Sequence, residues 1–323
     1  MNIVVASDQN YVVHLKTLIA SIGENNIDIE RIDIHILDGG ISVESKQSIS
    51  NMQQRYTNMR FHYYPMDDNV LREKLGDITG DRSLSAFARI LIPEIISADK
   101  AFYFDVDAVV LSDLREFYGI DLEDYAIAGV MDANPISRHI SVGLKVNDVY
   151  INTGVILWNL EKCRSICFSE LCRKFIADHN YNVDAMDQGT INGVLGALGL
   201  IKIIHPKYNA YTSLFQLKRS DILRIYKLEN YYSDSEINEA KNSPVFVHYT
   251  PNMTTRPWIK HCTHPLKDKY WEYRLMIEGG HKVLESDNRS IKMRILGAIY
   301  RKSPNIYYNL INSFGHVKSH HDS

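Results

Sequence analysis

The sequence predicts an α/β protein with a twisted, mostly parallel sheet that helices cover on both faces, and three observations lead to this prediction. Short β-rich apolar runs alternate with helical patterns over the first 250 residues, which is typical of parallel sheets with helical crossovers. Several of these runs end at polar residues, in the place where parallel sheets bind ligands. A chain of 323 residues, of which 45% are hydrophobic, can also bury a large core.

The expected strands and helices follow one another along the chain. Strands are expected over residues 2–6, 32–37, 59–64, 101–105, 125–131 and 153–160, with short strands near 200–204 and 245–248. Leucine and isoleucine recur at helical spacing from Leu15 to Ile22, which predicts the first helix. Further helices are expected over 42–52, 83–96, 161–179 and 190–198.

The C-terminal part of the chain has a different pattern. Ile291 and Ile295 lie on one helical face among basic residues, and Ser303-Pro304 predicts the start of a second helix. We therefore expect a domain over 1–275 and a basic, helical tail over 276–323. Short amphipathic helices with basic flanks can lie at a membrane interface. We expect the tail to contact the inner membrane surface; packing on the body or on another subunit is the alternative.

Charge is unevenly distributed along the chain. From His281 onward there are seven basic and three acidic residues, a charge of +4, so the first 280 residues carry −7 and the whole chain −3. A mildly acidic body argues against nucleic acid as a partner, whereas the basic tail suits an anionic surface.

Two further features indicate a cytoplasmic protein, which the basic tail would hold peripherally at the cytoplasmic face of the membrane. No stretch approaches the roughly 20 apolar residues that a membrane span needs, and the first segment has no basic n-region of a secretory signal. The four cysteines fit neither a zinc site nor a disulfide framework. We expect them to be free core thiols, with Cys163 and Cys167 on one helix face.

The strongest local signal is a pair of acids after an apolar strand. The segment Phe102-Tyr103-Phe104 runs directly into Asp105 and Asp107. Carboxylates at the end of a buried strand are unfavourable unless a partner compensates for their burial, and a divalent cation is the usual partner. Oxygen ligands suit Mg²⁺ or Mn²⁺. The alternative is a strand-ending turn with two solvated acids.

Weaker signals lie at other strand ends. Asp8 and Asn10 follow the first strand, where either can cap a helix or contact a nucleotide. Asn152 opens an apolar strand, and Asp187-Gln188 opens a helical run. His248 follows the strand 245–248 and, beside a pair of acids, becomes a candidate third metal ligand.

Taken together, these features resemble glycosyltransferase family 8, the bacterial lipopolysaccharide galactosyl- and glucosyltransferases, over roughly residues 1–275. Six motifs occur in the family's order: the opening strand with Ala6, Asp8, Asn10 and Tyr11; Ala88-Arg89; YFDVDAVV; YINTGVILWNL; Asp187-Gln188 with Asn192; and HYTPNMTTRPW. The resemblance implies a GT-A fold, which has a Rossmann-like, mostly parallel twisted sheet flanked by helices.

The resemblance also implies a role for each matched residue. Asp105, Asp107 and His248 would hold Mn²⁺ or Mg²⁺. The donor, a UDP-hexose, would be bound by Ala6, Asp8, Asn10, Tyr11, Arg89, Asp105, Val106, Asn152, Arg256 and Lys260. Gln188 and Asp187 would lie beside the anomeric carbon and Asp132 would face the acceptor, which makes these three the catalytic candidates.

Three departures from the family pattern are visible. Gly189 stands where the family often has a second acid. The segment between His248 and Pro257 is longer than usual and lacks the usual glycine, and Arg256 replaces the family's lysine. Arginine can still meet a phosphate, and with two hydrogen bonds.

The expected function is transfer of galactose or glucose, with retention of anomeric configuration, to a saccharide of the lipopolysaccharide core or another lipid-linked glycan. The resemblance supplies both retention and acceptor class. Three alternatives remain: a nucleotide-sugar-binding scaffold without turnover, a self-glucosylating primer protein of the glycogenin type, and a phosphohydrolase of the haloacid-dehalogenase type. The last carries its acid pair on the first strand and continues with Gly-Thr, whereas this chain continues Ala108-Val109.

Overall fold

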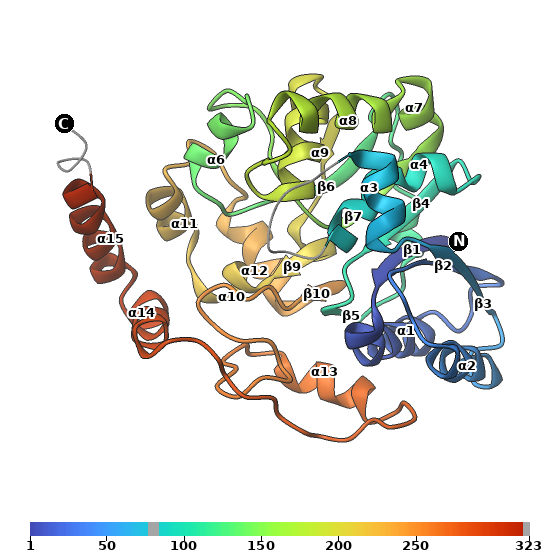
Figure 1. Cartoon of the computed structure of the whole chain (residues 1–323). Helices are drawn as coiled ribbons and strands as arrows, with labels where there is room; N and C mark the ends of the chain where they lie inside the picture. Colours follow the sequence, from blue (N-terminus) through green and yellow to red (C-terminus); the bar gives the residue numbers. More distant parts are fainter. Residues whose placement is uncertain (77–83, 319–323) are drawn as a thin grey trace.

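The computed structural model, which describes residues 1–76 and 84–318, has a central sheet between layers of helices (Figure 1). The strand order is β3-β2-β1-β4-β7-β6-β8. These strands are β1 (Asn2–Ser7), β2 (Ile32–Asp38), β3 (Met59–Pro65), β4 (Lys100–Phe104), β6 (Ile127–Met131), β7 (Ile151–Asn159) and β8 (Ile201–Ile203). Strand β7 is antiparallel to both of its neighbours, and every other pair is parallel. The predicted mostly parallel α/β sheet is confirmed.

A second, smaller sheet has the order β5-β10-β9. Its strands are β5 (Ala108–Val110), β9 (Ala210–Tyr211) and β10 (Phe246–His248). Strand β10 pairs antiparallel with β5, with His248 opposite Ala108. The sequence predicted only β10 of these strands, and the sheet matters because it joins the end of β10 to the acid pair.

The helices begin and end as follows. The α-helices are α1 (Val12–Asn25), α2 (Val43–Asn51), α3 (Asp68–Leu75), α4 (Ile92–Ile95), α5 (Arg115–Tyr118), α6 (Ile136–Ser141), α7 (Leu160–Ser165), α8 (Phe168–Asp178), α9 (Met186–Ala197), α10 (Thr212–Gln216), α11 (Arg219–Tyr226), α12 (Asp234–Asn242), α13 (Lys267–Arg274), α14 (Ile291–Lys302) and α15 (Pro304–Lys318). Within the described residues there are also four 3₁₀ segments: η1 (Gln9–Tyr11), η2 (Met52–Gln54), η3 (Leu84–Leu91) and η4 (Pro206–Asn209).

Two hydrophobic cores lie on the two faces of the sheet. Alternate residues of β1 point to opposite cores: Ile3 and Val5 pack with α1, whereas Val4 packs with η3 and α4. The core on the α1 side continues to β5, β10, α12 and α13, and the other continues to α7, α8 and α9. Burial on both faces explains why these strands read as continuous apolar runs.

Two predicted helices differ from the structure. The helix expected over 83–96 is a 3₁₀ segment, η3, followed by the short α4, and Ser83 lies outside the described residues. The helix expected over 161–179 is broken into α7 and α8 at Cys167, whose φ is +53°. Cys163 and Cys167 therefore do not share a helix face, so that prediction is wrong; Cys163 is buried and Cys167 is exposed.

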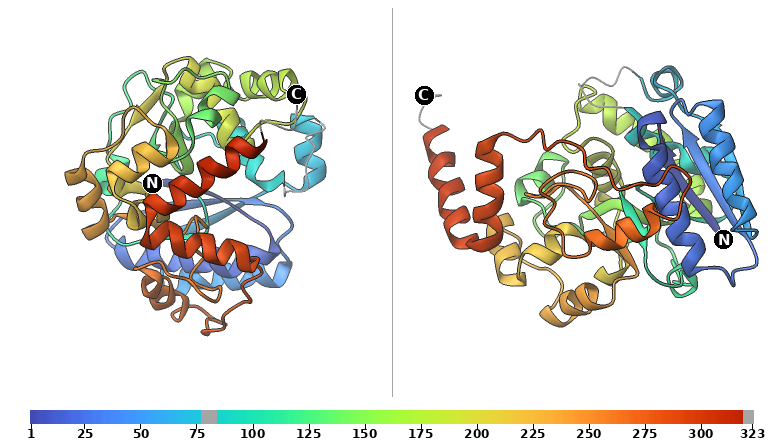
Figure 2. Two further views of the ribbon diagram at one scale, coloured as in Figure 1. Left: turned by 90° about the vertical axis from the view of Figure 1, so that its left-hand side faces the viewer. Right: turned by 90° about the horizontal axis from the view of Figure 1, so that it is seen from below.

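The C-terminal helices α14 and α15 lie side by side on the outside of the molecule (Figure 2). Helix α15 begins at Pro304, as the sequence predicted, and packs against α11. Tyr300 is fully buried, whereas Ile291 and Ile295 are exposed. One face of α14 thus packs on the body and another faces solvent. The domain boundary near residue 275 stays a prediction. No helix in the part of the chain that the structure describes is long and apolar enough to cross a membrane.

Candidate functional site

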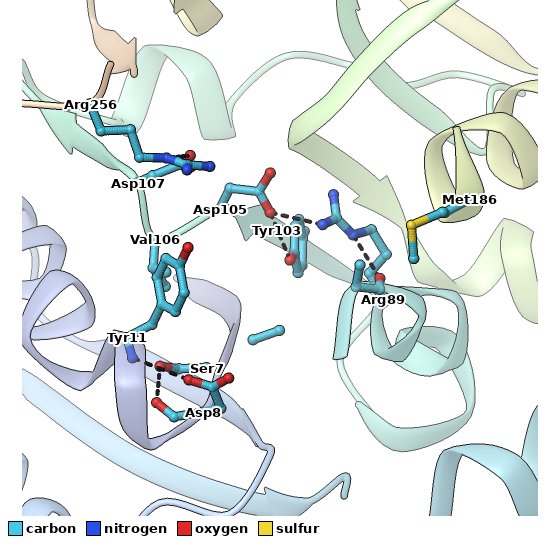
Figure 3. Close-up of a pocket in the computed structure, with 12 residues that line it drawn as sticks. Ser7, Asp8, Tyr11, Arg89, Tyr103, Asp105, Val106, Asp107, Met186 and Arg256 are labelled. Atoms are coloured by element: carbon cyan, nitrogen blue, oxygen red, sulfur yellow. Dashed lines mark hydrogen bonds and ion pairs between the residues drawn. The ribbon is translucent and has the colours of Figure 1, made fainter. Parts of the chain in front are cut away.

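Two cavities lie beside the carboxyl ends of the central strands. The larger, of about 400 Å³, opens between the ends of β1 and β4 (Figure 3). Among its lining residues are eight of the predicted donor and metal residues: Ala6, Asp8, Tyr11, Arg89, Asp105, Val106, Asp107 and Arg256. The second cavity, of about 330 Å³, is lined by Asp132, Asn152 and Gln188 among others. This is the edge at which open α/β sheets bind their ligands.

Three potential metal ligands meet at the larger cavity. Asp105, Asp107 and His248 each offer an atom within 4.8 Å of the others, and they are the one such group among the described residues. The small sheet creates this group, because β5 follows the two acids directly and pairs with the strand that ends at His248. A hydrogen bond of 2.9 Å from the Tyr249 amide to the Asp107 carbonyl extends the pairing.

The hydrogen bonds of His248 orient its ring toward the acids. Its Nδ1 lies 3.2 Å from Asn209 Oδ1, and the amide nitrogen of Asn209 donates to Asn152 Oδ1 at 2.9 Å. Asn209 Oδ1 is therefore an acceptor, which places the proton of the neutral ring on Nδ1. The opposite nitrogen, Nε2, lies 3.1 Å from Asp107 Oδ1 and 3.8 Å from Asp105 Oδ2. A neutral imidazole whose Nδ1–H is held by a hydrogen bond, so that Nε2 can bind the metal, is the usual form of a metal-ligating histidine.

Electrostatics at His248 also fit a cation. Burial lowers the pKa of His248, but the charge and hydrogen bond of Asp107, with the charge of Asp105, outweigh burial and raise it. A positive charge is thus favoured between these three side chains. A divalent ion would supply that charge and displace the proton from Nε2, since metal binding competes with protonation. The donor set therefore fits a hard or borderline divalent cation.

Gly154 leaves the space in which these ligands meet. A Cβ at this position would lie 2.1 Å from His248 Cε1 and 2.8 Å from Asp105 Oδ2. Only glycine lets the backbone of β7 pass so close to the two ligands. From the sequence, Gly154 was predicted only as part of a motif, and no role was predicted for Asn209. The only sequence feature that could have indicated Asn209 is its position as a polar residue directly before strand β9.

Arg89 joins two carboxylates in the interior. It is buried, and its guanidinium donates to Asp105 Oδ1 at 2.8 Å, pairs with Asp187 Oδ2 at 3.0 Å and donates to the Thr153 carbonyl at 2.7 Å. It also lies over the ring of Tyr103 at 4.3 Å. Burial lowers the pKa of Arg89, but the two carboxylates outweigh burial and raise it. Arg89 thus holds Asp105 through its Oδ1 (Figure 3), whereas His248 lies nearer its Oδ2.

Asp187 remains strained electrostatically despite its arginine partner. Burial is the largest effect on this carboxyl and raises its pKa to about 6, against the opposing effect of Arg89. Asp105, a nearby like charge, raises it further. Asp187 lines neither cavity and pairs with Arg89, so it acts on the site through that arginine.

Arg256 approaches the acid pair from the loop after β10. Its Nε donates to Asp107 Oδ2 at 2.8 Å. Burial raises the pKa of Asp107, but Arg256 and His248 outweigh burial and hold it below its usual range. Asp107 is therefore ionised. Arg256 also lines the larger cavity, where its guanidinium can meet an anionic ligand.

Gln188 connects the second cavity to the first. Its Nε2 donates to Asp132 Oδ2 at 2.9 Å, and its Oε1 accepts from the Thr153 amide at 3.2 Å. The carbonyl of the same Thr153 binds Arg89 at 2.7 Å. The structure therefore brings Asp132, Asn152 and Gln188 together. The next residue of β7 after Thr153 is Gly154, which lies against the metal ligands His248 and Asp105.

The departure at Gly189 has a steric reason. A Cβ there would lie 1.9 Å from the carbonyl oxygen of Asp184, so no side chain fits at this position. The turn before α9 causes the close approach, because Ala185 and Met186 both have positive φ. Met186 instead lines the larger cavity.

Four predicted donor residues lie outside the larger cavity or have a structural role. Asp8 accepts hydrogen bonds from the amides of Asn10 and Tyr11 at 2.8 and 3.1 Å, so it caps η1 while it lines the cavity. Asn10 and Lys260 are exposed and line neither cavity. Asn152 lines the second cavity, and its Oδ1 accepts from Gly154 and Asn209.

The sequence profile of Glycosyl transferase family 8 matches residues 2–262. This chain belongs to glycosyltransferase family 8. Among its relatives, General stress protein A of Bacillus subtilis is 26% identical over 280 residues, which are 84% of this chain and 92% of that protein. Glycosyltransferase GlyA of Streptococcus pneumoniae is 23% identical over 274 residues, which are 84% of this chain and 34% of that longer protein.

Solved structures show the same fold. The galactosyltransferase LgtC, crystallised with donor and acceptor sugar analogues, superposes with a TM-score of 0.70 at 22% identity, over 86% of this chain and 96% of that chain. The predicted GT-A fold is confirmed. As a member of family 8, this chain is a glycosyltransferase, and the profile ends before α13, so the C-terminal helices lie outside it.

Proposed function

We propose that this protein transfers galactose or glucose from a UDP-sugar to a saccharide acceptor, with Mn²⁺ or Mg²⁺ and with retention of the anomeric configuration. The observation that carries the proposal is the group formed by Asp105, Asp107 and His248. The two acids of this group line a cavity of about 400 Å³ that also has two arginines in its wall. Carboxylates and an oriented imidazole suit a divalent ion, and the arginines suit a diphosphate.

The residues of the larger cavity have different roles in binding the donor and in stabilising its leaving group. A divalent ion, when bound, neutralises charge on the departing diphosphate. Arg256 adds a fixed positive charge at the same place, which stabilises the leaving group without reorganisation. Arg89 orients Asp105 through a hydrogen bond, and the backbone around Ala6 and Asp8, with the ring of Tyr11, forms the wall for the nucleoside.

The residues of the second cavity act on the sugar and the acceptor. Gln188 lies between Asp132 and the strand that carries the donor site, where it can contact the transferred sugar. A carboxamide is a poor nucleophile, and both ends of this one already make hydrogen bonds. We therefore propose a same-face attack in which a phosphate oxygen of the leaving group takes the proton of the acceptor hydroxyl. Asp132 would orient that hydroxyl.

The acceptor is proposed to belong to the lipopolysaccharide core or another lipid-linked glycan. Support comes from the galactosyltransferase LgtC, whose structure holds an acceptor sugar analogue, and from the tail. Helix α14 exposes Ile291, Met293 and Ile295 within a segment rich in basic residues. Such a surface suits an anionic membrane interface, so we propose a cytoplasmic protein held peripherally at the inner membrane.

The deciding experiment is donor hydrolysis. Purified protein is incubated with UDP-galactose, UDP-glucose or UDP-N-acetylglucosamine, with and without Mn²⁺, and UDP release is measured. Release from one hexose donor that needs Mn²⁺ and is lost in Asp105→Asn is expected. The control is Asp99→Asn, which changes an exposed acid near the other end of the same strand. UDP binding without release, even with acceptors, would favour the scaffold; no binding would refute the proposal.

A further inference from the structure

A segment of the loop after β10 forms part of the wall of the second cavity. Asn252 lines this cavity together with Tyr226 and Ser213, and Asp132 and Gln188 line it too. The loop runs from His248 to Arg256, so both of its ends belong to the donor site. This is the segment that is longer than in the resembling family and lacks its glycine. Contacts that fix the middle of this loop therefore help to shape the second cavity.

Helix α14 contacts the middle of this loop with one face. Gly297, Tyr300 and Arg301 are spaced i, i+3 and i+4, so they share that face. A Cβ on Gly297 would lie 2.4 Å from the carbonyl oxygen of Met253, and Arg301 donates a hydrogen bond to the same oxygen. Met253 has a φ of +53°, a conformation that costs free energy in a non-glycine residue. Contacts from α14 thus stabilise an unfavourable backbone.

Tyr300 fixes the neighbouring residue, Asn252. The Tyr300 hydroxyl accepts a hydrogen bond from Asn252 Nδ2 at 3.1 Å and lies 2.9 Å from the Tyr226 hydroxyl. The same Nδ2 also contacts the hydroxyls of Tyr226, at 3.3 Å, and Ser213. One end of the amide is therefore surrounded by three hydroxyls. The other end, Oδ1, has no hydrogen-bond partner within residues 1–76 and 84–318, and the residue lines the cavity.

We propose that α14 is part of the acceptor site: Tyr300 positions Asn252 so that its side-chain carbonyl accepts a hydrogen bond from a hydroxyl of the acceptor saccharide. This inference rests on the proposed transferase function. It makes Asn252 a residue that determines acceptor affinity and Tyr300 a positioning residue, and it gives the tail a role in the site itself. A saccharide bound in this cavity against Asp132 and Gln188 would also meet Asn252, which lines the same cavity.

The test compares three variants of the full-length protein. Tyr300→Phe removes one hydroxyl and keeps the ring, and Asn252→Ala removes the amide. The control is Tyr307→Phe, because Tyr307 lies in α15 against the Tyr300 ring and its hydroxyl has no hydrogen-bond partner in the described part of the chain. A panel of mono-, di- and oligosaccharides that includes lactose supplies the probe acceptor, chosen by its effect on UDP release by the wild type.

The expected result is a split between the two substrates. In Tyr300→Phe and Asn252→Ala the acceptor KM rises about 5- to 10-fold, the effect of losing one net hydrogen bond. The donor KM of Tyr300→Phe is expected to stay within about twofold of the wild-type value. A lost binding contact raises the KM only of the substrate that makes the contact, which here is the acceptor. Amide hydrogen exchange of residues 249–256 is expected to be faster in Tyr300→Phe than in Tyr307→Phe, because the loop loses a fixed contact.

Each contrary outcome has a distinct meaning. An acceptor KM and loop exchange that are unchanged in Tyr300→Phe would overturn this inference alone, provided that UDP release from the donor persists. A wild type whose UDP release responds to no saccharide of the panel would overturn the assignment of this cavity to an acceptor. Absence of Mn²⁺-dependent UDP release from every donor would instead refute the proposed function.

Discussion

Replacing Gly154 by alanine is a direct test of the metal-ligand group. The added Cβ would lie 2.1 Å from His248 Cε1, whereas non-bonded carbons rest at about 3.5–4.0 Å. The imidazole would therefore have to move by roughly 1.4 Å, which is several times the tolerance of about 0.2 Å for ligand distances. Asp105 would be displaced too, because its Oδ2 would lie 2.8 Å from the new methyl group.

Loss of two well-placed ligands out of three is expected to weaken Mn²⁺ binding by at least about 10- to 100-fold, or 1.4 to 2.8 kcal/mol. The assay is a Mn²⁺ titration in the presence of UDP, followed by calorimetry and by electron paramagnetic resonance. The Mn²⁺ concentration that half-saturates UDP release from the donor should rise in parallel, while far-ultraviolet circular dichroism reports whether the variant is folded.

Gly23→Ala is the matched control, because its Cβ would lie 2.4 Å from the ring of Tyr56, away from the cavity. Both variants overpack an aromatic or imidazole ring, which costs about 1–3 kcal/mol of stability. Only Gly154→Ala should also weaken the metal. A folded Gly154→Ala protein that binds Mn²⁺ within about twofold of the wild type would refute the assignment of these ligands, since a misplaced ligand shell cannot keep its affinity.

Three further changes test the ion pair of Arg89, the burial of His264 and the cap of α12. Arg89→Met leaves Asp187 buried without its partner and should cost about 3–5 kcal/mol in urea unfolding, part of which Asp187→Asn should restore; equal stability of the single variant and the wild type would contradict the ion pair. Burial lowers the pKa of His264 from 6.5 to about 3, so stability that is complete above pH 6.5 is lost as the pH falls toward 3. At pH 5 the loss is about 2 kcal/mol, and His264→Asn, which can still accept from the Leu266 amide, should show less loss than the wild type between pH 7 and 5. Ser233→Ala removes the capping box of α12 and should lower the free energy of unfolding by about 1 kcal/mol; an unchanged urea midpoint would exclude a role for this cap.

Much of the central sheet could be predicted because burial on both faces leaves a direct trace in the sequence. The run Phe102–Phe104 is apolar since β4 is covered on both sides, and the break at Asp105 marks the point where it reaches the cavity. The same logic placed β1, β2, β3 and β7 to within a few residues. Resemblance to the family then assigned roles that no single residue pattern could assign.

Helix boundaries were less predictable where the backbone departs from regular geometry. Cys167 adopts a left-handed conformation, in which glycine is the usual residue. The sequence has no glycine there, so it did not predict the break between α7 and α8. The residues Leu84–Leu91 have helical periodicity but form a 3₁₀ segment that delivers Arg89 between two carboxylates. Periodicity reports which face is buried, and it does not distinguish the two helix types over so short a stretch.

The sequence by itself determined the class of fold, the acid pair at the end of β4 and the family. Tertiary structure alone decided how the site is assembled. His248 meets Asp107 across 141 residues of chain because β10 pairs with β5, and Arg256 reaches the same acid across 149 residues. Space left by Gly154 and the contact of Tyr300 with Asn252 likewise exist only in the folded chain. The physical reason is that local patterns record the burial of one element, whereas a site depends on which distant elements come into contact.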